Sequence, residues 1–268
     1  MVTIHDLNFY NIGHLMPRTR RLVLRYFVTR SARTADHVIT VSEFSKEQIV
    51  ELLGVLPEKV TVTYNTVKER PTYAVELEEL ERRYNVRQPY ILGLSSPSPH
   101  KNIANLVRAF ALLKQREAEK LRLVLAGHLP RGSTDLSRVL NDANVHDSVV
   151  FTGYVPDAVL PSLYAHAEAL VFPSIYEGFG IPILEAFSYG TPVVCSKVAA
   201  IPEVAGDAAI YFDPHNIEEM ADAIFAVLNN DALREELVSR GKARVQLFTW
   251  EKAAERTLAV YRRVLDDA

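Results

Sequence analysis

Short apolar runs alternate with longer segments of helical period along most of this sequence, and this alternation restricts the fold more than any other feature. The runs 121–126 and 169–172 consist almost entirely of apolar residues, which is typical of parallel strands buried on both faces. The segments between such runs repeat apolar residues every three or four positions, as amphipathic helices do. The sequence therefore predicts βα units and a parallel sheet.

The pattern is regular from about residue 88 to the C-terminus and predicts one doubly wound, Rossmann-like α/β domain there. Strands are expected at 90–94, 121–126, 149–151, 169–172, 193–195 and 209–212. Helices are expected at 102–116, 136–141, 159–166, 182–189, 217–229, 232–246 and 250–265.

The first 65 residues continue the alternation with fewer units. Ser42 is a suitable N-cap and Gly54 a suitable C-cap for a helix between them, and an arginine-rich helix precedes it. Three expected strands are too few for a free-standing doubly wound sheet, which one or two more βα units would complete. Strands are expected at 2–4, 37–41 and 59–64. The expected organisation is a partial N-terminal Rossmann-like portion at 1–65, a charge-rich linker at 66–88 and a complete C-terminal domain at 89–268.

Composition excludes several classes of function. The net charge of −3 gives no global electrostatic basis for binding nucleic acid. Cys195 is the only cysteine and lies in an apolar run, so a thiolate metal site is excluded and a buried thiol is expected. The eight histidines lack a metal-binding spacing such as HExxH. No apolar stretch is long enough to span a bilayer and no signal-peptide plan is present, so a cytoplasmic protein is expected. No metal or other cofactor is expected either.

The most informative segment is FPSIYEGFGIPILE, which connects an expected strand to an expected helix. Gly178 and Gly180 let the backbone approach a ligand closely, and free amides at a helix start attract anions. A carboxylate beside a diphosphate would be repelled, so Glu177 and Glu185 are better suited to accept hydrogen bonds from hydroxyls on either side of the phosphates. A nucleotide sugar presents that order of ribose, diphosphate and sugar. The alternative is a glycine-rich turn with two surface glutamates that complement the helix dipole.

EGFGIPILE resembles the E-x7-E motif of retaining glycosyltransferases of family 4, the group 1 type with the GT-B fold. The resemblance extends in order along the chain through segments such as TIHDL, SEFSKEQIVELLGV, HKNIANLVRAF and VVFTGYV. It implies that Glu177 contacts the donor sugar, that Glu185 contacts the ribose, and that the amides of Phe179 and Gly180 lie near sugar or phosphate. The donor-binding residues it implies are His100, Lys101, Gly153, Tyr154, Glu177, Gly178, Phe179, Gly180, Ile181 and Glu185.

His100 and Lys101 follow the expected strand at 90–94 and precede a helix. A lysine at a helix start is unfavourable to the helix dipole, and a diphosphate would give it a partner. The alternative is a solvated lysine beside a proline-rich turn. The family has Arg-Lys here, so the mostly neutral His100 predicts a weaker donor affinity or one that favours acid pH.

The resemblance also places His5 at the cleft near the anomeric carbon of the donor, whereas a local His-Asp pair is the alternative from the sequence alone. The expected catalytic group is thus His5, Lys101 and Glu177. The resemblance implies a longer N-terminal portion, so the chain is expected to be a fragment, a natural minimal form, or a chain that another copy or a partner completes. The arginine-rich helix is expected to pack with a solvated basic face, and a peripheral contact with a membrane surface or a polyprenyl phosphate is the alternative.

The resemblance implies a retaining transfer of a hexose, with mannose ranked first, from a GDP- or UDP-linked donor to a glycan or lipid-linked acceptor, and no bound metal is expected. Lys101 and helix-start amides would stabilise the leaving diphosphate. The alternative from another class is a non-catalytic nucleotide-sugar-binding module or one subunit of a split enzyme. A dehydrogenase is disfavoured because no GxGxxG follows an expected strand.

Overall fold

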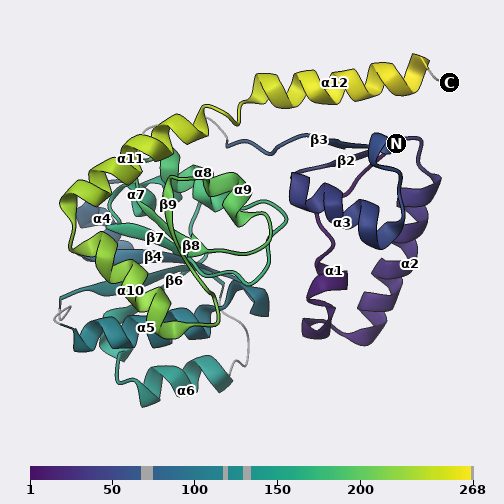
Figure 1. Cartoon of the computed structure of the whole chain (residues 1–268). Coiled ribbons are helices and arrows are strands. Elements are labelled where there is room, and N and C mark those ends of the chain that lie inside the picture. Colours follow the sequence, from purple (N-terminus) through teal and green to yellow (C-terminus); the bar gives the residue numbers. More distant parts are fainter. Residues whose placement is uncertain (68–74, 117–119, 129–133, 267–268) are drawn as a thin grey trace.

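The computed structural model describes residues 1–67, 75–116, 120–128 and 134–266, which contain two parallel β-sheets (Figure 1). The larger sheet has the order β6-β5-β4-β7-β8-β9, and the smaller has the order β1-β2-β3. Neighbouring strands are parallel throughout both sheets. The predicted α/β class and the two Rossmann-like portions are therefore confirmed.

The larger unit forms all six strands expected for it: β4 (Tyr90–Ser95), β5 (Arg122–Gly127), β6 (Val149–Gly153), β7 (Ala169–Phe172), β8 (Val193–Ser196) and β9 (Ala209–Phe212). Its helices are α4 (Leu77–Tyr84), α5 (Ile103–Gln115), α6 (Thr134–Asp142), α7 (Leu160–Ala165), α8 (Ile181–Ser188), α9 (Ile201–Ala205), α10 (Ile217–Leu228) and α11 (Asp231–Val245), with 3-10 turns η3 (Pro99–Lys101) and η4 (His146–Ser148).

Both faces of the larger sheet are covered because its strand side chains alternate between two apolar cores. Ile91 and Val171 pack with α5, α6 and α10 on one face, whereas Leu92 and Phe172 pack with α7, α8 and α9 on the other. The strand order reverses between β4 and β7, since the chain moves from β4 toward β6 and then returns through β7 to β9. This reversal is the topological switch point of a doubly wound sheet.

The smaller unit contains β1 (Val2–Thr3), β2 (Val38–Thr40) and β3 (Val60–Val62), with α1 (Asn8–Asn11), α2 (Arg18–Thr34), α3 (Glu43–Leu53), η1 (Gly13–Leu15) and η2 (Pro57–Lys59). The predicted caps of α3 are confirmed. The Ser42 hydroxyl accepts a hydrogen bond from the Ser45 amide at 3.0 Å, and Gly54 adopts a left-handed conformation with φ of 67°. These caps fix where α3 begins, which is at the carboxyl end of β2.

The segment predicted as a linker, residues 66–88, differs from that expectation in its second half. Residues 77–84 form α4, whose Leu80 is fully buried against the larger unit, and Val86 is buried beside it. The helix is amphipathic, but its single fully buried leucine stands among five charged residues of the same helix, so the composition alone suggested a linker. Residues 68–74 of the predicted linker lie outside the described residues.

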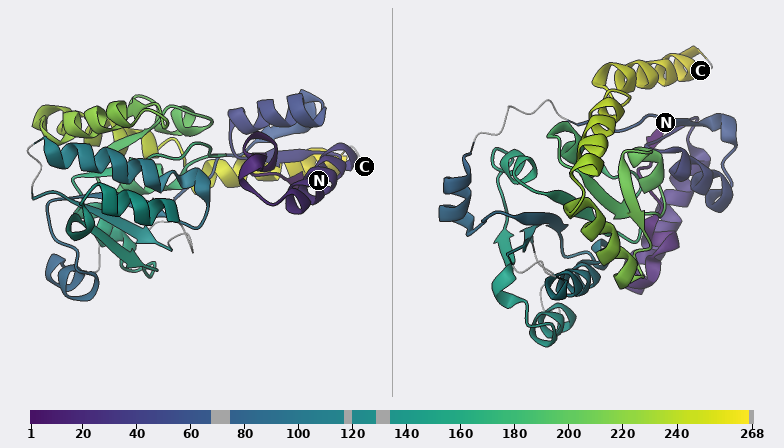
Figure 2. Two further views of the ribbon diagram at one scale, coloured as in Figure 1. Left: turned by 90° about the horizontal axis from the view of Figure 1, so that it is seen from below. Right: turned by 60° about the vertical axis from the view of Figure 1, so that its left-hand side comes forward.

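The last helix, α12 (Trp250–Asp266), leaves the larger unit and runs alongside the smaller one (Figures 1 and 2). The indole N–H of Trp250 donates to the Val67 carbonyl at 3.1 Å, and Arg256 donates to the Val62 carbonyl at 3.3 Å. The Arg256 guanidinium also lies 5.5 Å from the centre of the Tyr64 ring. These contacts tie α12 to the end of the smaller sheet.

Candidate functional site

The candidate site lies at the switch point of the larger sheet. Because β4 and β7 are adjacent and parallel, both end at the same edge of the sheet. The loop after β4 carries His100 and Lys101, and the loop after β7 carries Glu177 and Gly178. In open α/β sheets, ligands bind in the crevice outside the carboxyl ends of the strands at this point.

The two loops are tied together through their backbones. The Ile175 amide donates to the His100 carbonyl at 2.9 Å. Asn102 adopts a left-handed conformation with φ of 57°, which asparagine tolerates better than most residues, and its amide donates to the carbonyls of Pro173 at 3.1 Å and Pro214 at 2.7 Å. These bonds fix the position of Lys101 relative to the loop after β7.

Lys101 and Glu177 form a direct ion pair across the two loops. The Lys101 Nζ lies 2.6 Å from the Glu177 Oε1, and the two side chains are 20% and 16% exposed. The ammonium also lies 5.2 Å from the centre of the Phe172 ring. Because both side chains are largely shielded from water, each charge is compensated mainly by the other.

Burial shifts the pKa values of two groups beside this pair. Burial lowers the pKa of His100 from its ordinary value of 6.5, against the opposing effect of Glu177, so its imidazole is neutral near pH 7. Burial raises the pKa of Asp6, and the nearby Glu177 carboxylate acts in the same direction. The positive charge available to an anion at this place is therefore that of Lys101.

The turn at 177–180 needs its two glycines for different reasons. The smaller unit lies directly against Gly178, whereas Gly180 has a positive φ. A Cβ on Gly178 would lie 2.6 Å from the Asp6 Cβ and 2.7 Å from the His5 carbonyl oxygen, closer than non-bonded atoms approach. Gly180 has φ of 113° at the N-cap of α8, a conformation that residues with a side chain rarely adopt. The turn therefore brings the backbone of the larger unit against the smaller unit directly before α8 begins.

Polar contacts hold the residues that follow β2 against this turn and against α9. The Ser42 hydroxyl donates to the Gly178 carbonyl at 2.8 Å. The Glu203 carboxylate accepts hydrogen bonds from the amides of Glu43 at 2.7 Å and Phe44 at 3.0 Å, at the start of α3. A carboxylate at a helix start is stabilised by the amides and the helix dipole. These contacts place the carboxyl ends of β1 and β2 beside those of β4 and β7.

Glu185 lies one turn into α8 and is only 9% exposed. Its Oε2 accepts a hydrogen bond from the Tyr164 hydroxyl at 2.9 Å. The Tyr164 ring stacks on Tyr189 with centroids 5.9 Å apart and planes 11° apart. The carboxylate is thus held in one orientation by an aromatic pair from α7 and the end of α8.

The other predicted residues lie on neighbouring parts of the two units rather than in the ion pair. His5 and Ile181 line a cavity of about 640 Å³ together with Tyr64 and residues of α12. Phe179 is buried against the Tyr64 ring. At the end of β6, two strands away from β4, Gly153 has φ of 68° and Tyr154 is 66% exposed.

Several residues of the site were not predicted. Asp6 packs on Gly178, and the Tyr176 hydroxyl accepts a hydrogen bond from the Asn11 amide at 3.2 Å. Ser42 was predicted as a helix cap but not as a contact of the turn, and Glu203 was not singled out. The adjacency of Asp6 to His5 and of Tyr176 to Glu177 was the available signal. The contacts of Ser42 and Glu203 join segments more than a hundred residues apart, which no local pattern reveals.

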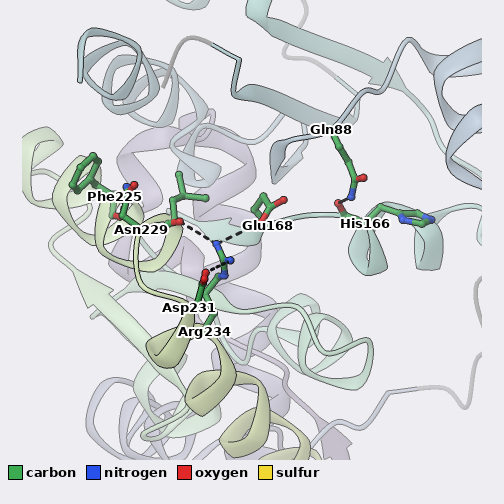
Figure 3. Close-up of polar contacts among 8 residues, drawn as sticks. Gln88, His166, Glu168, Phe225, Asn229, Asp231 and Arg234 are labelled. Atoms are coloured by element: carbon green, nitrogen blue, oxygen red, sulfur yellow. Dashed lines mark hydrogen bonds and ion pairs between the residues drawn. The ribbon is translucent and has the colours of Figure 1, made fainter. Parts of the chain in front are cut away.

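A separate cavity of about 710 Å³ lies where β4, β5 and β7 begin, at the opposite edge of the larger sheet (Figure 3). The Arg234 guanidinium is hydrogen-bonded to the Asp231 carboxylate, and its Nη1 lies 3.7 Å from the Glu168 Oε2. Figure 3 also shows Gln88, whose amide donates to the His166 carbonyl at 2.8 Å. The charge of Arg234 is balanced by two carboxylates, and the cavity is at the amino ends of the strands. We therefore place the candidate site at the other edge.

Among the described residues, no group of three or more histidine, cysteine, aspartate or glutamate side chains is arranged to hold a metal ion. Within the same part of the chain, no helix has both the length and the apolar composition needed to cross a bilayer.

Comparisons with known proteins find several relatives of this chain. Residues 78–244 match the family model described as glycosyl transferases group 1, and residues 1–70 match the model described as glycosyltransferase family 4. The chain is 33% identical over 267 residues to the O-antigen chain mannosyltransferase B of Escherichia coli, covering 98% of this chain and 70% of that protein. Other curated relatives are also longer than this chain, which spans as little as 29% of their length.

Two solved structures show the same fold. Sucrose-phosphate synthase from Thermosynechococcus elongatus aligns with a TM-score of 0.80 at 24% identity, over 100% of this chain and 68% of that one. Anabaena HepE in complex with UDP-glucose aligns with a TM-score of 0.81 at 22% identity, over 97% of this chain and 72% of that one. The arrangement of the two sheets is that of the GT-B fold, as the sequence predicted.

Proposed function

Because this chain belongs to the group 1 glycosyltransferases, a family of sugar-transferring enzymes, we propose that it moves a hexose from a nucleoside diphosphate sugar to a glycan or lipid-linked acceptor. The observation that carries this proposal is the Lys101–Glu177 ion pair at the switch point between β4 and β7. A relative at 33% identity is named a mannosyltransferase, which supports mannose as the first sugar to test. HepE in complex with UDP-glucose supports a nucleotide-sugar donor.

In the proposed complex, the Lys101–Glu177 ion pair is broken and each side chain pairs with the donor instead. Lys101 would pair with the diphosphate, and Glu177 would accept hydrogen bonds from sugar hydroxyls. The amides at the start of α8 would add further donors to the phosphates, because a helix N-terminus favours anions. A nucleotide sugar supplies an anion and hydroxyls together, so it leaves neither member of the pair unsatisfied. A nucleoside diphosphate without a sugar would leave the Glu177 carboxylate beside the phosphates.

Glu185 is proposed to accept hydrogen bonds from the ribose hydroxyls. Its bond from Tyr164 supports this role, because a carboxylate that is already oriented loses little freedom when it binds a diol. The position one turn into α8 would place the ribose on the far side of the diphosphate from Glu177.

For the chemical step, we propose that Lys101 and the helix-start amides stabilise charge on the leaving diphosphate, as preorganised electrostatic groups do. Neutral His100 would add a hydrogen bond rather than a second positive charge. His5, at the end of β1, would lie on the acceptor side of the crevice. Retention of the anomeric configuration and independence from metal ions are proposed from the family resemblance.

A second candidate function is a nucleotide-sugar-binding module that needs a further polypeptide for transfer. The observation that favours it is the smaller sheet, in which β1 pairs only with β2 among the described strands. Calorimetry with UDP, GDP and their sugars, combined with a turnover assay on the same preparation, separates the two functions. Binding without transfer or donor hydrolysis would favour the module.

The same calorimetric panel tests the residue roles. Glu185→Ala should weaken every nucleotide, whether or not it carries a sugar, because it removes the proposed ribose contact. Wild-type affinity of Glu185→Ala for all of these ligands would contradict the assignment. Tyr164→Phe is the matched variant, since it removes the orienting hydroxyl and leaves the carboxylate in place, and we expect it to have a smaller effect of the same kind.

A further inference from the structure

Helix α2 carries an unusual concentration of positive charge. Its 17 residues, Arg18–Thr34, include six of the 30 lysines and arginines of the chain and no aspartate or glutamate. The chain as a whole has a net charge of −3, so this helix is strongly basic within an acidic protein. Such a local patch attracts anionic partners even where the net charge does not.

The side of α2 that faces away from the core carries four exposed apolar side chains. Ala32 is buried, whereas Leu22, Val23, Tyr26 and Phe27 are 62%, 53%, 61% and 60% exposed. At 100° per residue, Val23, Tyr26 and Phe27 lie on the face opposite Ala32, and Leu22 lies at the edge of that face. The sequence predicted a packed helix with a solvated basic face, but the structure leaves the largest apolar side chains of α2 in solvent.

The arginines of α2 divide into two sets. Arg21 and Arg25 are half-buried, and Arg25 stacks over the Tyr10 ring at 4.2 Å from its centre. Arg18, Arg20, Arg30 and Arg33 are exposed at either end of the apolar group, and Arg33 donates to the Leu53 carbonyl at 2.7 Å. Positive charges thus flank exposed aliphatic and aromatic side chains, which is the pattern of a helix that lies in the plane of a membrane interface.

We propose that α2 docks the protein on an anionic lipid bilayer, with Leu22, Val23, Tyr26 and Phe27 entering the headgroup region. The exposed arginines would pair with lipid phosphates, each contributing to the attraction of a basic segment to an anionic leaflet. A nucleic acid would use the charge of this surface but not its aliphatic side chains. A second copy of the chain would bring a second set of arginines against the first.

This surface adjoins the candidate site. Phe27 and Ser31 of α2 line a cavity of about 310 Å³ together with His5 and Asp6. A bilayer bound by α2 would therefore lie beside the end of β1 that carries His5. An acceptor held at a membrane could reach the crevice from this side, although docking itself does not depend on the proposed sugar transfer.

The test is co-flotation of the full chain with vesicles of phosphatidylcholine alone or of equal parts phosphatidylcholine and phosphatidylglycerol. Binding is expected only to the anionic vesicles, and it should weaken as salt is added. Tyr26→Ser with Phe27→Ser should reduce that binding by at least about tenfold, because it removes the apolar area that enters the interface. Arg18→Gln and Arg20→Gln should each reduce it by about fivefold, the fold-change that about 1 kcal/mol represents.

The matched control is Tyr261→Ser with Leu265→Ser on α12, which removes exposed apolar side chains from a helix that also contains acidic residues. We expect it to leave vesicle binding unchanged. Thermal unfolding and nucleotide affinity check that each variant is folded. Absence of wild-type binding, equal binding to neutral vesicles, or unchanged binding by the Tyr26 and Phe27 variant would overturn the proposal. Conversion of an oligomer to a monomer by that variant, without a change in vesicle binding, would instead make this face a contact between copies.

Discussion

The two units of this molecule differ in how completely they are built. The six-stranded sheet is covered by helices on both faces, and most of its strand residues are buried. The three-stranded sheet has one apolar core, and its strand β1 pairs only with β2 among the described strands. The larger unit holds the charged pair of the candidate site, whereas the smaller unit contributes mainly backbone and hydroxyl contacts to it. The charged pair is therefore held by the unit whose sheet is covered on both faces.

The strongest test of this division is Lys101→Ala. It removes the positive charge proposed to stabilise the leaving diphosphate and leaves Glu177 unpaired beside it. We expect kcat/KM to fall by roughly 100- to 1,000-fold. The matched control is Lys59→Ala, which removes an exposed lysine from the smaller unit. Similar losses in the two variants would show that the larger unit does not carry the charge on which function depends.

Gly178→Ala tests the contact between the two units. The added Cβ would collide with Asp6 and the His5 carbonyl, so the smaller unit must move away from the turn. We expect transfer to fall by roughly tenfold or more, because small displacements of positioned groups reduce rates strongly. Nucleotide affinity should change less, since Lys101 and Glu185 lie in the larger unit. An equal fall in both quantities would argue that the turn serves the donor alone.

Acid titration should give the smallest effect. The pKa of His100 lies below its ordinary value of 6.5 in the folded protein, so the unfolded chain binds a proton more readily. Its contribution to stability is therefore present above pH 6.5 and is lost as the pH falls through the folded pKa. Denaturant unfolding at pH 7 and pH 5 should show a smaller pH dependence for His100→Gln than for the wild type. An identical dependence would mean that His100 is not shielded.

Much of the larger unit was predictable because its signals are local. The strands at 169–172 and 209–212 were predicted at their observed bounds, since continuous apolar runs between polar turns specify buried parallel strands. The helix α4 was missed because Leu80 is the one fully buried side chain in a short charged segment. Local apolar pattern therefore predicts an element well only where several of its residues are buried.

The site was predictable to the same local extent. Lys101 and Glu177 were each singled out by their place after a strand, but their direct pairing depends on the strand order, which places β4 beside β7. The packing of Asp6 on Gly178 and the exposure of the apolar face of α2 depend on the arrangement of whole elements. A resemblance to a family can suggest such arrangements, whereas residue spacing alone cannot.

The central claim is that the Lys101–Glu177 pair opens to receive a nucleotide sugar. Its most direct test is calorimetry of Glu177→Gln with a nucleoside diphosphate and with the matching nucleotide sugar. Removing the carboxylate frees Lys101 and removes a repulsive charge, so the nucleoside diphosphate should bind roughly tenfold more tightly, a gain of about 1.4 kcal/mol. The nucleotide sugar should lose its advantage over the nucleoside diphosphate. Unchanged affinity for both ligands would contradict the account.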